Sequence, residues 1–471
     1  MTYLSKLQIC DIIYYVIMNT YIKSKKKIKL GYIQIFALGF LAVILIGTLL
    51  LCLPVASKSG QWTGFLDALF TSTSATCVTG LVVFDTFTHF SLFGQIVILL
   101  LIQIGGLGFM TFIAVISIIL GKKVSFYRRK SLMQATGAIN LNEAVGLLFL
   151  IFKITIAIEL IGTALLSIRF IPMFGFWEGL YYSIFHSISA FCNAGFDLMG
   201  RFGEYTSMTT FATDKLVLIT IMLLIICGGL GFIVWRDIAK NKFKFKNYSL
   251  HSKIVLITSL VLILLGAIVT FACDYSGELA RFSFGDKILN SFFQSVTCRT
   301  AGFNSIAQNS LSGATIMVSL FLMFVGGSPS STAGGVKTTT FAVMILNSFS
   351  MARKNKSVET KRRRFSDTLI KQSSAILNTY LVMIIVAMII IMPTVEGMGI
   401  PFVECLYEVV SAVGTVGIAM GTTAGFSVIG KIVLIILMFM GRIGGFSMFM
   451  MLNEKYVEPP ITKPNADILI G

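Results

Sequence analysis

The chain has 471 residues, of which 56% are hydrophobic and only 13% are charged. A soluble domain carries about 25% charged residues, so this composition excludes an ordinary water-soluble protein. With a mean hydropathy of +0.87, the sequence predicts a membrane protein with several spans. The net charge of +17 raises the question of a polyanionic partner, and the positions of the charges answer it.

Four segments hold 24 of the 38 Lys and Arg residues: 23–29, 122–130, 236–253 and 353–371. They alternate with long apolar runs, which is the pattern of cytoplasmic loops between membrane spans. This spacing argues against a nucleic acid partner and leaves membrane lipids with anionic headgroups as suitable ones. The loops on the other side carry more acids than bases, so they should concentrate cations. We expect a multi-pass protein of the cell membrane with both termini in the cytoplasm.

A segment of seven residues that ends in glycine occurs four times, as SATCVTG, SAFCNAG, VTCRTAG and SAVGTVG, ending at Gly80, Gly195, Gly302 and Gly417. Such self-similarity at a long period indicates four copies of one structural unit. Before each copy lies an amphipathic stretch of about 12 to 15 residues, too short for a bilayer that needs about 20. Each stretch has an acid near its start: Asp67, Glu178, Asp286 and Glu404. We predict four re-entrant half-helices.

Two apolar spans flank each half-helix. The first spans are predicted at 31–53, 144–170, 250–273 and 371–395, and the second at 92–120, 214–239, 313–347 and 428–452. The expected fold is an all-α membrane protein with eight full spans, in four pseudo-symmetric helix, half-helix, helix repeats around one central pore. The expected units are a cytoplasmic N-terminal segment 1–30, repeats at 31–130, 131–247, 248–360 and 361–455, and a cytoplasmic tail 456–471.

The second spans share a glycine pair, in IGGLGF, CGGLGF, VGGSPS and IGGFSM. One such pair is typical of close helix packing, but four at matching distances from the turn glycine favour a shared role around one axis. Aligned on these pairs, Arg442 corresponds to Gln103, Ile226 and Phe324. An arginine at membrane depth usually faces the protein interior. Two interpretations stay open for Arg442: a charge that faces the pore and repels cations, or a structural tie to a carboxylate or to backbone carbonyls.

A half-helix that returns through a glycine turn leaves backbone carbonyls unpaired at membrane depth, which is tolerated where they line an aqueous path. Four such turns around one axis would form rings of carbonyl oxygens that replace the hydration shell of K+. The fourth copy contains Thr415-Val416-Gly417, the core tripeptide of potassium filters. The predicted ion-binding residues, with K+ as the metal ion they hold, are Val78, Thr79, Gly80, Asn193, Ala194, Gly195, Thr300, Ala301, Gly302, Thr415, Val416 and Gly417.

Residues 326–340, GGSPSSTAGGVKTTT, interrupt the second span of the third repeat. Glycines, a proline and many hydroxyls cannot hold a continuous helix that faces lipid. We expect this segment to face the conduction path, because apolar spans flank it closely on both sides. Lys337 either adds a positive charge there or marks the cytoplasmic end of the following helix.

The fourfold pore-loop repeat, CRTAGFNS at 298–305 and GGSPSSTAGGVKTTT resemble the Trk/Ktr/HKT superfamily, and most nearly the membrane subunits of bacterial Ktr potassium uptake systems. The resemblance covers residues 30–455, although Gly445 stands where many relatives have proline. It implies potassium uptake driven by the membrane potential and an intramembrane gate. The implied gate residues are Gly326, Gly327, Ser328, Pro329, Ser330, Ser331, Thr332, Ala333, Gly334, Gly335, Lys337 and Arg442.

The resemblance also implies partners. It predicts a homodimer that sits on a ring of cytosolic KtrA-type regulatory subunits. The chain has no strand followed by G-x-G-x-x-G, so control by ATP or NAD would act through that ring. Sodium dependence, with Na+ as a coupling or regulatory ion, stays open.

Three alternatives are weighed beside potassium uptake. A sodium-selective or non-selective cation channel would share the architecture. A secondary solute transporter should show inverted repeats, whereas these four run parallel. An enzyme is not expected, because eight cysteines without a C-x-x-C pair and three histidines form no catalytic or metal-binding motif. No covalently bound cofactor is expected either.

Overall fold

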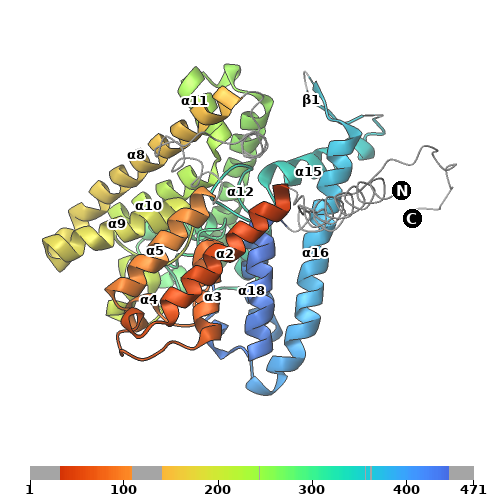
Figure 1. The fold of residues 1–471 in the computed structure, drawn as a ribbon. Helices are drawn as coiled ribbons and strands as arrows, with labels where there is room; N and C mark the ends of the chain where they lie inside the picture. The colour runs from red at the N-terminus through yellow and green to blue at the C-terminus, as the bar shows by residue number, and fades with distance from the viewer. Residues whose placement is uncertain (1–31, 109–140, 243, 356, 361–362, 445–471) are drawn as a thin grey trace, which may run out of the picture.

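The computed structural model describes residues 32–108, 141–242, 244–355, 357–360 and 363–444. The chain is mostly helical in these ranges, as expected (Figure 1). The segments 1–30 and 456–471, the basic cluster 122–130 and Gly445 lie outside the described residues. Among the described residues, three helices are long and apolar enough to cross a membrane, and a fourth span results if one sharply bent pair is counted together.

The first two repeats contain the predicted helix, half-helix, helix order. The first consists of α2 (Tyr32–Cys52), α3 (Phe65–Thr76), α4 (Thr86–His89) and α5 (Leu92–Leu107). The second consists of α8 (Leu141–Phe174), α9 (Phe176–Cys192), α10 (Lys215–Gly229) and α11 (Phe232–Asn241). Short 3-10 turns lie at Pro54–Ala56, Met199–Phe202, Ser207–Phe211 and Phe245–Asn247.

The last two repeats follow the same order. The third consists of α12 (Leu250–Asp274), α13 (Phe284–Thr297), α14 (Gly313–Phe324) and α15 (Thr338–Ala352). The fourth consists of α16 (Asp367–Val395), α17 (Phe402–Gly414) and α18 (Val428–Ile443). The strands β1 (Glu359–Thr360) and β2 (Arg363–Arg364) form an antiparallel hairpin between α15 and α16. Further 3-10 turns lie at Glu278–Arg281, Gln308–Ser310, Glu396–Met398 and Thr423–Gly425.

The predicted first spans correspond to α2, α8, α12 and α16, of which α8, α12 and α16 are long and apolar enough to cross a membrane, whereas two of the predicted second spans are broken. The α10 and α11 helices meet at 96°, and α14 stops at Phe324, fourteen residues before α15 begins at Thr338. The half-helices α3, α13 and α17 have 12, 14 and 13 residues, but α9 has 17 and exceeds the predicted length. The residues next to the expected ends of this half-helix are also compatible with a helix, so the amphipathic pattern alone does not define where α9 begins and ends.

Capping side chains fix where the second spans begin. Ser91, Asp214, Ser312 and Ser427 each accept a hydrogen bond from a backbone N–H in the first turn of α5, α10, α14 and α18. Seventeen residues after three of these caps stand Gly108, Gly231 and Gly444, whose φ angles are 81°, 90° and 95°. The left-handed backbone at these glycines ends the helix at about the same level in the first, second and fourth repeats.

Counting residues from these caps corrects the alignment of Arg442 with the other repeats. Counted from the caps, Arg442 stands at the position of Gly106, Gly229 and Gly327, and not at that of Gln103, Ile226 and Phe324. The glycine pair of the fourth repeat begins three residues later than its counterparts, so alignment on the pair shifted the comparison by one helical turn. An arginine therefore replaces a glycine in one of four equivalent places.

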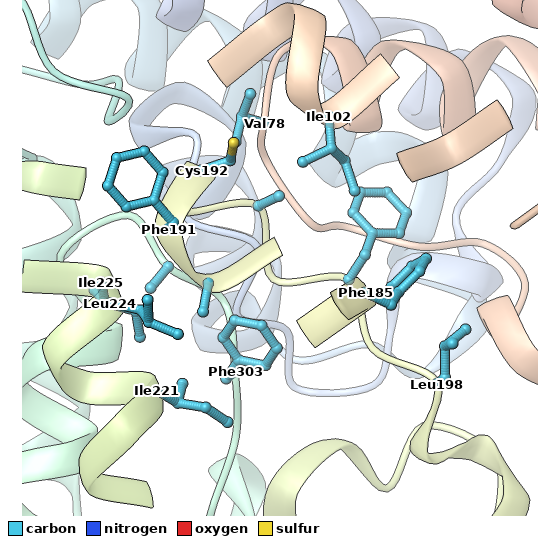
Figure 2. Close-up of a cluster of buried hydrophobic side chains, with 14 of the residues drawn as sticks. Val78, Ile102, Phe185, Phe191, Cys192, Leu198, Ile221, Leu224, Ile225 and Phe303 are labelled. Atoms are coloured by element: carbon cyan, nitrogen blue, oxygen red, sulfur yellow. The ribbon is translucent and has the colours of Figure 1, made fainter. Parts of the chain in front are cut away.

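The core lies between the repeats, while the outer faces of the first spans stay apolar and exposed. Figure 2 shows side chains from α5, α9, α10 and the turns after α3 and α13, all of which belong to one hydrophobic cluster. By contrast, Leu49 on α2, Ile268 on α12 and Ile389 on α16 are 64%, 64% and 66% exposed. Such a surface suits a hydrocarbon environment and not water.

Candidate functional site

The four turn glycines form a closed ring. A Cβ atom on Gly80 would lie 2.5 Å from the carbonyl oxygen of Ala194, and one on Gly195 would lie 2.7 Å from that of Ala301. A Cβ on Gly302 would lie 2.8 Å from the carbonyl oxygen of Val416, and one on Gly417 would lie 2.0 Å from that of Thr79. Each repeat thus contacts the next in chain order and the fourth contacts the first. The structure brings the predicted glycines together around one axis.

The residues before these glycines have an unusual backbone. Val78, Asn193, Thr300 and Thr415 have left-handed φ angles of 57°, 59°, 68° and 51°, the glycines two residues later are also left-handed, and the residue between them is not. In an extended strand, successive carbonyls point to opposite sides. In these segments the sign of φ changes from each residue to the next. Successive carbonyl oxygens of one segment can therefore point to the same side and face the axis. Non-glycine residues in this conformation are strained, and such strain is concentrated at functional sites.

Hydroxyl groups at the ends of the half-helices hold these segments. The amide of Gly80 donates to Ser74 Oγ and that of Gly417 donates to Ser411 Oγ, both at 3.0 Å. Ser189 Oγ donates to the Phe196 carbonyl at 2.6 Å, and Thr297 Oγ1 donates to the Phe303 carbonyl at 2.7 Å. The half-helices α3, α9, α13 and α17 end directly before the segments, so the negative ends of four helix dipoles are directed at the axis. This field favours a cation.

A cavity of about 170 Å³ opens beyond the glycine ring and is lined by all four glycines. Two residues beyond each glycine stand Val82, Asp197, Asn304 and Ala419, which also line this cavity. Asp197 Oδ1 accepts a hydrogen bond from the Met199 amide at 2.9 Å. Loss of solvation raises the pKa of the Asp197 carboxyl to about 7. Asp85 also lines the cavity, so its outer part is acidic.

Asp85 ties the outer loops of the first two repeats together. Its Oδ1 accepts from the amides of Phe87 and Thr88, and its Oδ2 accepts from the amide of Tyr205 at 3.1 Å. Tyr205 Oη in turn donates to the Val83 carbonyl at 3.0 Å. These bonds fix the shape of the cavity mouth and occupy both carboxylate oxygens of Asp85.

The predicted gate residues lie against the opposite side of the ring. A Cβ on Gly326 would lie 3.0 Å from Thr300 Cγ2, and a Cβ on Gly334 would lie 2.0 Å from Thr415 Oγ1. Val325 and Val336 form an isolated parallel bridge that closes the segment at its base. The intramembrane segment 326–337 therefore packs directly on the residues that precede the third and fourth turn glycines.

Backbone groups of the broken α10–α11 span hold this segment in place. The Gly229 carbonyl accepts from the Ser328 amide at 3.0 Å, and the Gly228 carbonyl accepts from the Thr332 amide at 3.3 Å. The Phe232 amide donates to the Ser330 carbonyl at 2.8 Å. The helix break thus supplies unpaired backbone groups that the segment satisfies, as is required at membrane depth.

Arg442 and Lys337 both donate to carbonyl oxygens of the segment. Arg442 donates to the Thr332 carbonyl and to the carbonyls of Gly105 and Gly106 at the end of α5, the last at 3.2 Å. Lys337 Nζ donates to the carbonyls of Ala333 and Gly334 at 2.7 and 3.2 Å. Of the two interpretations of Arg442, this geometry is that of a tie to backbone carbonyls. Lys337 folds back onto the segment from the N-cap of α15.

Two polar side chains next to the site were not predicted from the sequence to have a function. Glu159 on α8 accepts from Gln103 Nε2 on α5 at 3.1 Å, which links the first two repeats behind the ring. Arg299 is 9% exposed and lies in the third ring segment. Its place directly after Cys298 in CRTAG was visible in the sequence, but its contacts depend on packing between repeats.

Four half-helices with left-handed turns around one axis, an acidic mouth and a mostly helical, apolar scaffold define a pore-loop membrane protein. Residues 24–458 match the model of the TrkH family, described as cation transport protein. The chain belongs to this family, whose members are transport proteins and not enzymes. The resemblance noted from the motifs is thereby confirmed.

Individual proteins show the same relationship. The chain is 40% identical to Ktr system potassium uptake protein B of Bacillus subtilis (strain 168), over 93% of this chain and 96% of that protein. It is 38% identical to potassium/sodium uptake protein NtpJ of Enterococcus hirae, over 96% of this chain and 100% of that protein. The crystal structure of the potassium transporter TrkH from Vibrio parahaemolyticus matches with a TM-score of 0.67 at 18% identity, over 91% and 86% of the two chains. That structure supports the fold alone.

Proposed function

We propose that this chain takes up K+ across the cell membrane through the ring of carbonyls formed by the four segments that end at Gly80, Gly195, Gly302 and Gly417. The closed ring of glycine contacts carries the proposal, because it places four strained segments and four helix dipole ends on one axis. Ktr system potassium uptake protein B, 40% identical, bears the same activity in its name. The membrane potential drives the cation inward.

Sodium is the second candidate ion, transported itself or required for K+ transport. One observation favours it: NtpJ, 38% identical over 96% of this chain, is named a potassium/sodium uptake protein. Only the fourth segment contains T-V-G, so the four segments offer chemically different side chains at equivalent positions. Fewer equivalent carbonyl sites than in a symmetric filter would weaken discrimination between the two ions.

The intramembrane segment 326–337, with Lys337 and Arg442, is proposed as the gate. Its support is the packing of Gly326 and Gly334 on the filter residues Thr300 and Thr415, next to the inner side of the ring. The segment continues directly into α15 and the β1–β2 hairpin (Figure 1). A movement of α15 would therefore pull on the gate.

Regulation is proposed to come from outside this chain. The Ktr resemblance favours a homodimer on a ring of cytosolic nucleotide-binding subunits of the KtrA type, with both termini and the basic loops on the cytoplasmic side. ATP or NAD would act on that ring. The hairpin β1–β2, rich in basic residues, is a suitable contact for it.

Growth rescue tests the proposed uptake. A bacterium that lacks its own potassium uptake systems would express this chain together with a KtrA-type subunit and grow at low K+. We expect rescue by the wild-type chain and weaker rescue by Gly417→Ser at matched membrane abundance. Absence of rescue by a wild-type chain that is folded and present in the membrane would contradict potassium uptake.

A further inference from the structure

Arg299 stands in the third ring segment at a position where the other repeats have small residues. It lies three residues before Gly302, and the equivalent positions before the other turn glycines are Cys77, Cys192 and Gly414. Its side chain is 9% exposed, so a guanidinium group is placed in the packed layer behind the ring. A buried charge is costly unless specific partners compensate it, so its partners indicate why it is tolerated.

The partners of Arg299 are neutral, and one of them belongs to the intramembrane segment. Nη2 donates to the Gly326 carbonyl at 3.4 Å and to Ser259 Oγ at 3.2 Å, and Nη1 donates to the Ser259 carbonyl at 3.5 Å. Nε is buried without a hydrogen-bond partner. Among the described residues, no carboxylate forms an ion pair with it. Its charge is therefore met by carbonyl and hydroxyl dipoles alone.

Gly326 is the point at which the segment leaves the helix. The α14 helix ends at Phe324, and the Val325–Val336 bridge closes the base of the segment. A Cβ on Gly326 would lie 2.4 Å from the Gly334 carbonyl, so no larger residue fits there without a shift. Arg299 holds the carbonyl of this first residue, whereas Arg442 holds Thr332 near the middle of the segment. The two arginines fasten different points of one loop.

The guanidinium also links the third ring segment to Ser259 on α12, but the local fold of the segment is held by its own backbone. The Arg299 amide donates to the Val296 carbonyl at 3.1 Å, and the Ala301 amide donates to the Thr297 carbonyl at 3.0 Å. These backbone bonds persist whatever side chain stands at position 299. Changes to the side chain should thus affect the intramembrane segment more than the direction of the carbonyls.

We propose that Arg299 is a positioning residue that fastens Gly326, the first residue of the intramembrane segment, to the third ring segment and so favours the closed gate. The proposal rests on the proposed function of segment 326–337 as a gate. Its three bonds are long for charge-assisted hydrogen bonds, which suits a contact that breaks when the gate opens. Loss of the contact should raise resting flux and leave ion preference unchanged.

The test measures resting K+ flux per folded molecule in proteoliposomes, without any regulatory subunit, together with competition by Na+. Arg299→Gln should raise flux about three- to tenfold, within the range of coupling energies between packed elements, with the same preference for K+ over Na+. Arg299→Lys keeps the charge but loses the fork of donors, so it should give a smaller rise. Arg169→Gln, which changes an exposed arginine paired with Asp214, is the matched control and should leave flux unchanged.

A double-variant comparison separates this proposal from the gate itself. Deletion of 328–334 removes the loop that Arg299 would position, so Arg299→Gln should add nothing on that background. Three results would overturn the role of Arg299 and leave the gate standing. They are a further rise in flux when Arg299→Gln is added to the deletion, a changed ion preference in the Arg299 variants, and unchanged flux in both Arg299 variants while the deletion alone raises flux. Unchanged flux in the deletion would overturn the gate and this inference with it. If Arg299→Gln does not fold, Arg299→Lys carries the same comparison.

Discussion

At the scale of single residues, the turn glycines combine two requirements that can be separated. Gly417 has a φ of 87°, and a Cβ on it would lie 2.0 Å from the Thr79 carbonyl. Gly421 has a φ of 91° but no atom within 4 Å of such a Cβ. Both positions disfavour a side chain through backbone strain, but only the first would displace a carbonyl of the neighbouring segment.

Gly417→Ser should therefore reduce the preference for K+ over Na+ by about tenfold. This factor corresponds to a loss of about 1.4 kcal/mol in the free energy of binding K+ relative to Na+ when the Thr79 carbonyl is displaced. Competition between the two ions in an uptake assay measures it. Gly421→Ser is the matched control and should keep the wild-type preference. Equal preference in wild type and Gly417→Ser would remove Gly417 from the filter.

Arg442 connects the intramembrane segment to the end of α5. Arg442→Gln removes the charge and most of the donors to the carbonyls of Thr332, Gly105 and Gly106. We expect faster K+ uptake per folded molecule, because the segment proposed as the gate loses one of the side chains that hold it. We also expect a loss of about 1 to 3 kcal/mol of stability, because buried carbonyls lose their partner. Flux and thermal unfolding of the same preparation check both. A drop in stability with an unchanged rate would make Arg442 purely structural.

Asp197 gives the outer cavity a charge that depends on pH. Loss of solvation raises its pKa to about 7, so the carboxyl is charged above that pH and becomes neutral as external pH falls through it. K+ uptake at low K+ should thus fall between about pH 8 and pH 6, because a neutral mouth concentrates fewer cations. Asp197→Asn should show low uptake at both pH values. The same pH dependence in Asp197→Asn and wild type would contradict this assignment.

At the scale of elements, the sequence predicted more about helices than about their breaks. The acids Asp67, Glu178, Asp286 and Glu404 do lie in the first turns of the four half-helices. The 96° bend between α10 and α11 was not predicted, since G-G-L-G-F is compatible with a packed helix as well as with a break. The left-handed Gly231 that makes the bend is stabilised by contacts with the distant segment 326–337.

The intramembrane segment is the element whose removal has the clearest expected effect. Deletion of Ser328–Gly334 should raise K+ flux in vesicles severalfold and weaken dependence on the proposed regulatory partner, because the contacts of Gly334 with Thr415 and of Thr332 with Gly228 are lost. Gel filtration of the variant establishes that it is folded. Flux at or below the wild-type level in folded protein would leave only a structural break in the helix.

At the scale of the whole molecule, four repeats were visible in the sequence, but the order in which they meet was not. The glycine contacts run from each repeat to the next, and Lys431 at the start of α18 closes the ring through an ion pair with Asp67 of α3 at 2.8 Å. Asp67, which pairs with Lys431, and Gly105, which accepts a hydrogen bond from Arg442, each lie more than 300 positions away in the sequence, and no local pattern could identify them.

The central claim is that these four segments form one path that prefers K+. Potassium and sodium flux into proteoliposomes that hold only this chain, driven by an imposed inside-negative potential, test it most directly. The account predicts saturable K+ entry that Na+ competes with only weakly, and a loss of this preference in Gly417→Ser but not in Gly421→Ser. Equal entry of both ions in wild type, or a preference unaffected by Gly417→Ser, would contradict it.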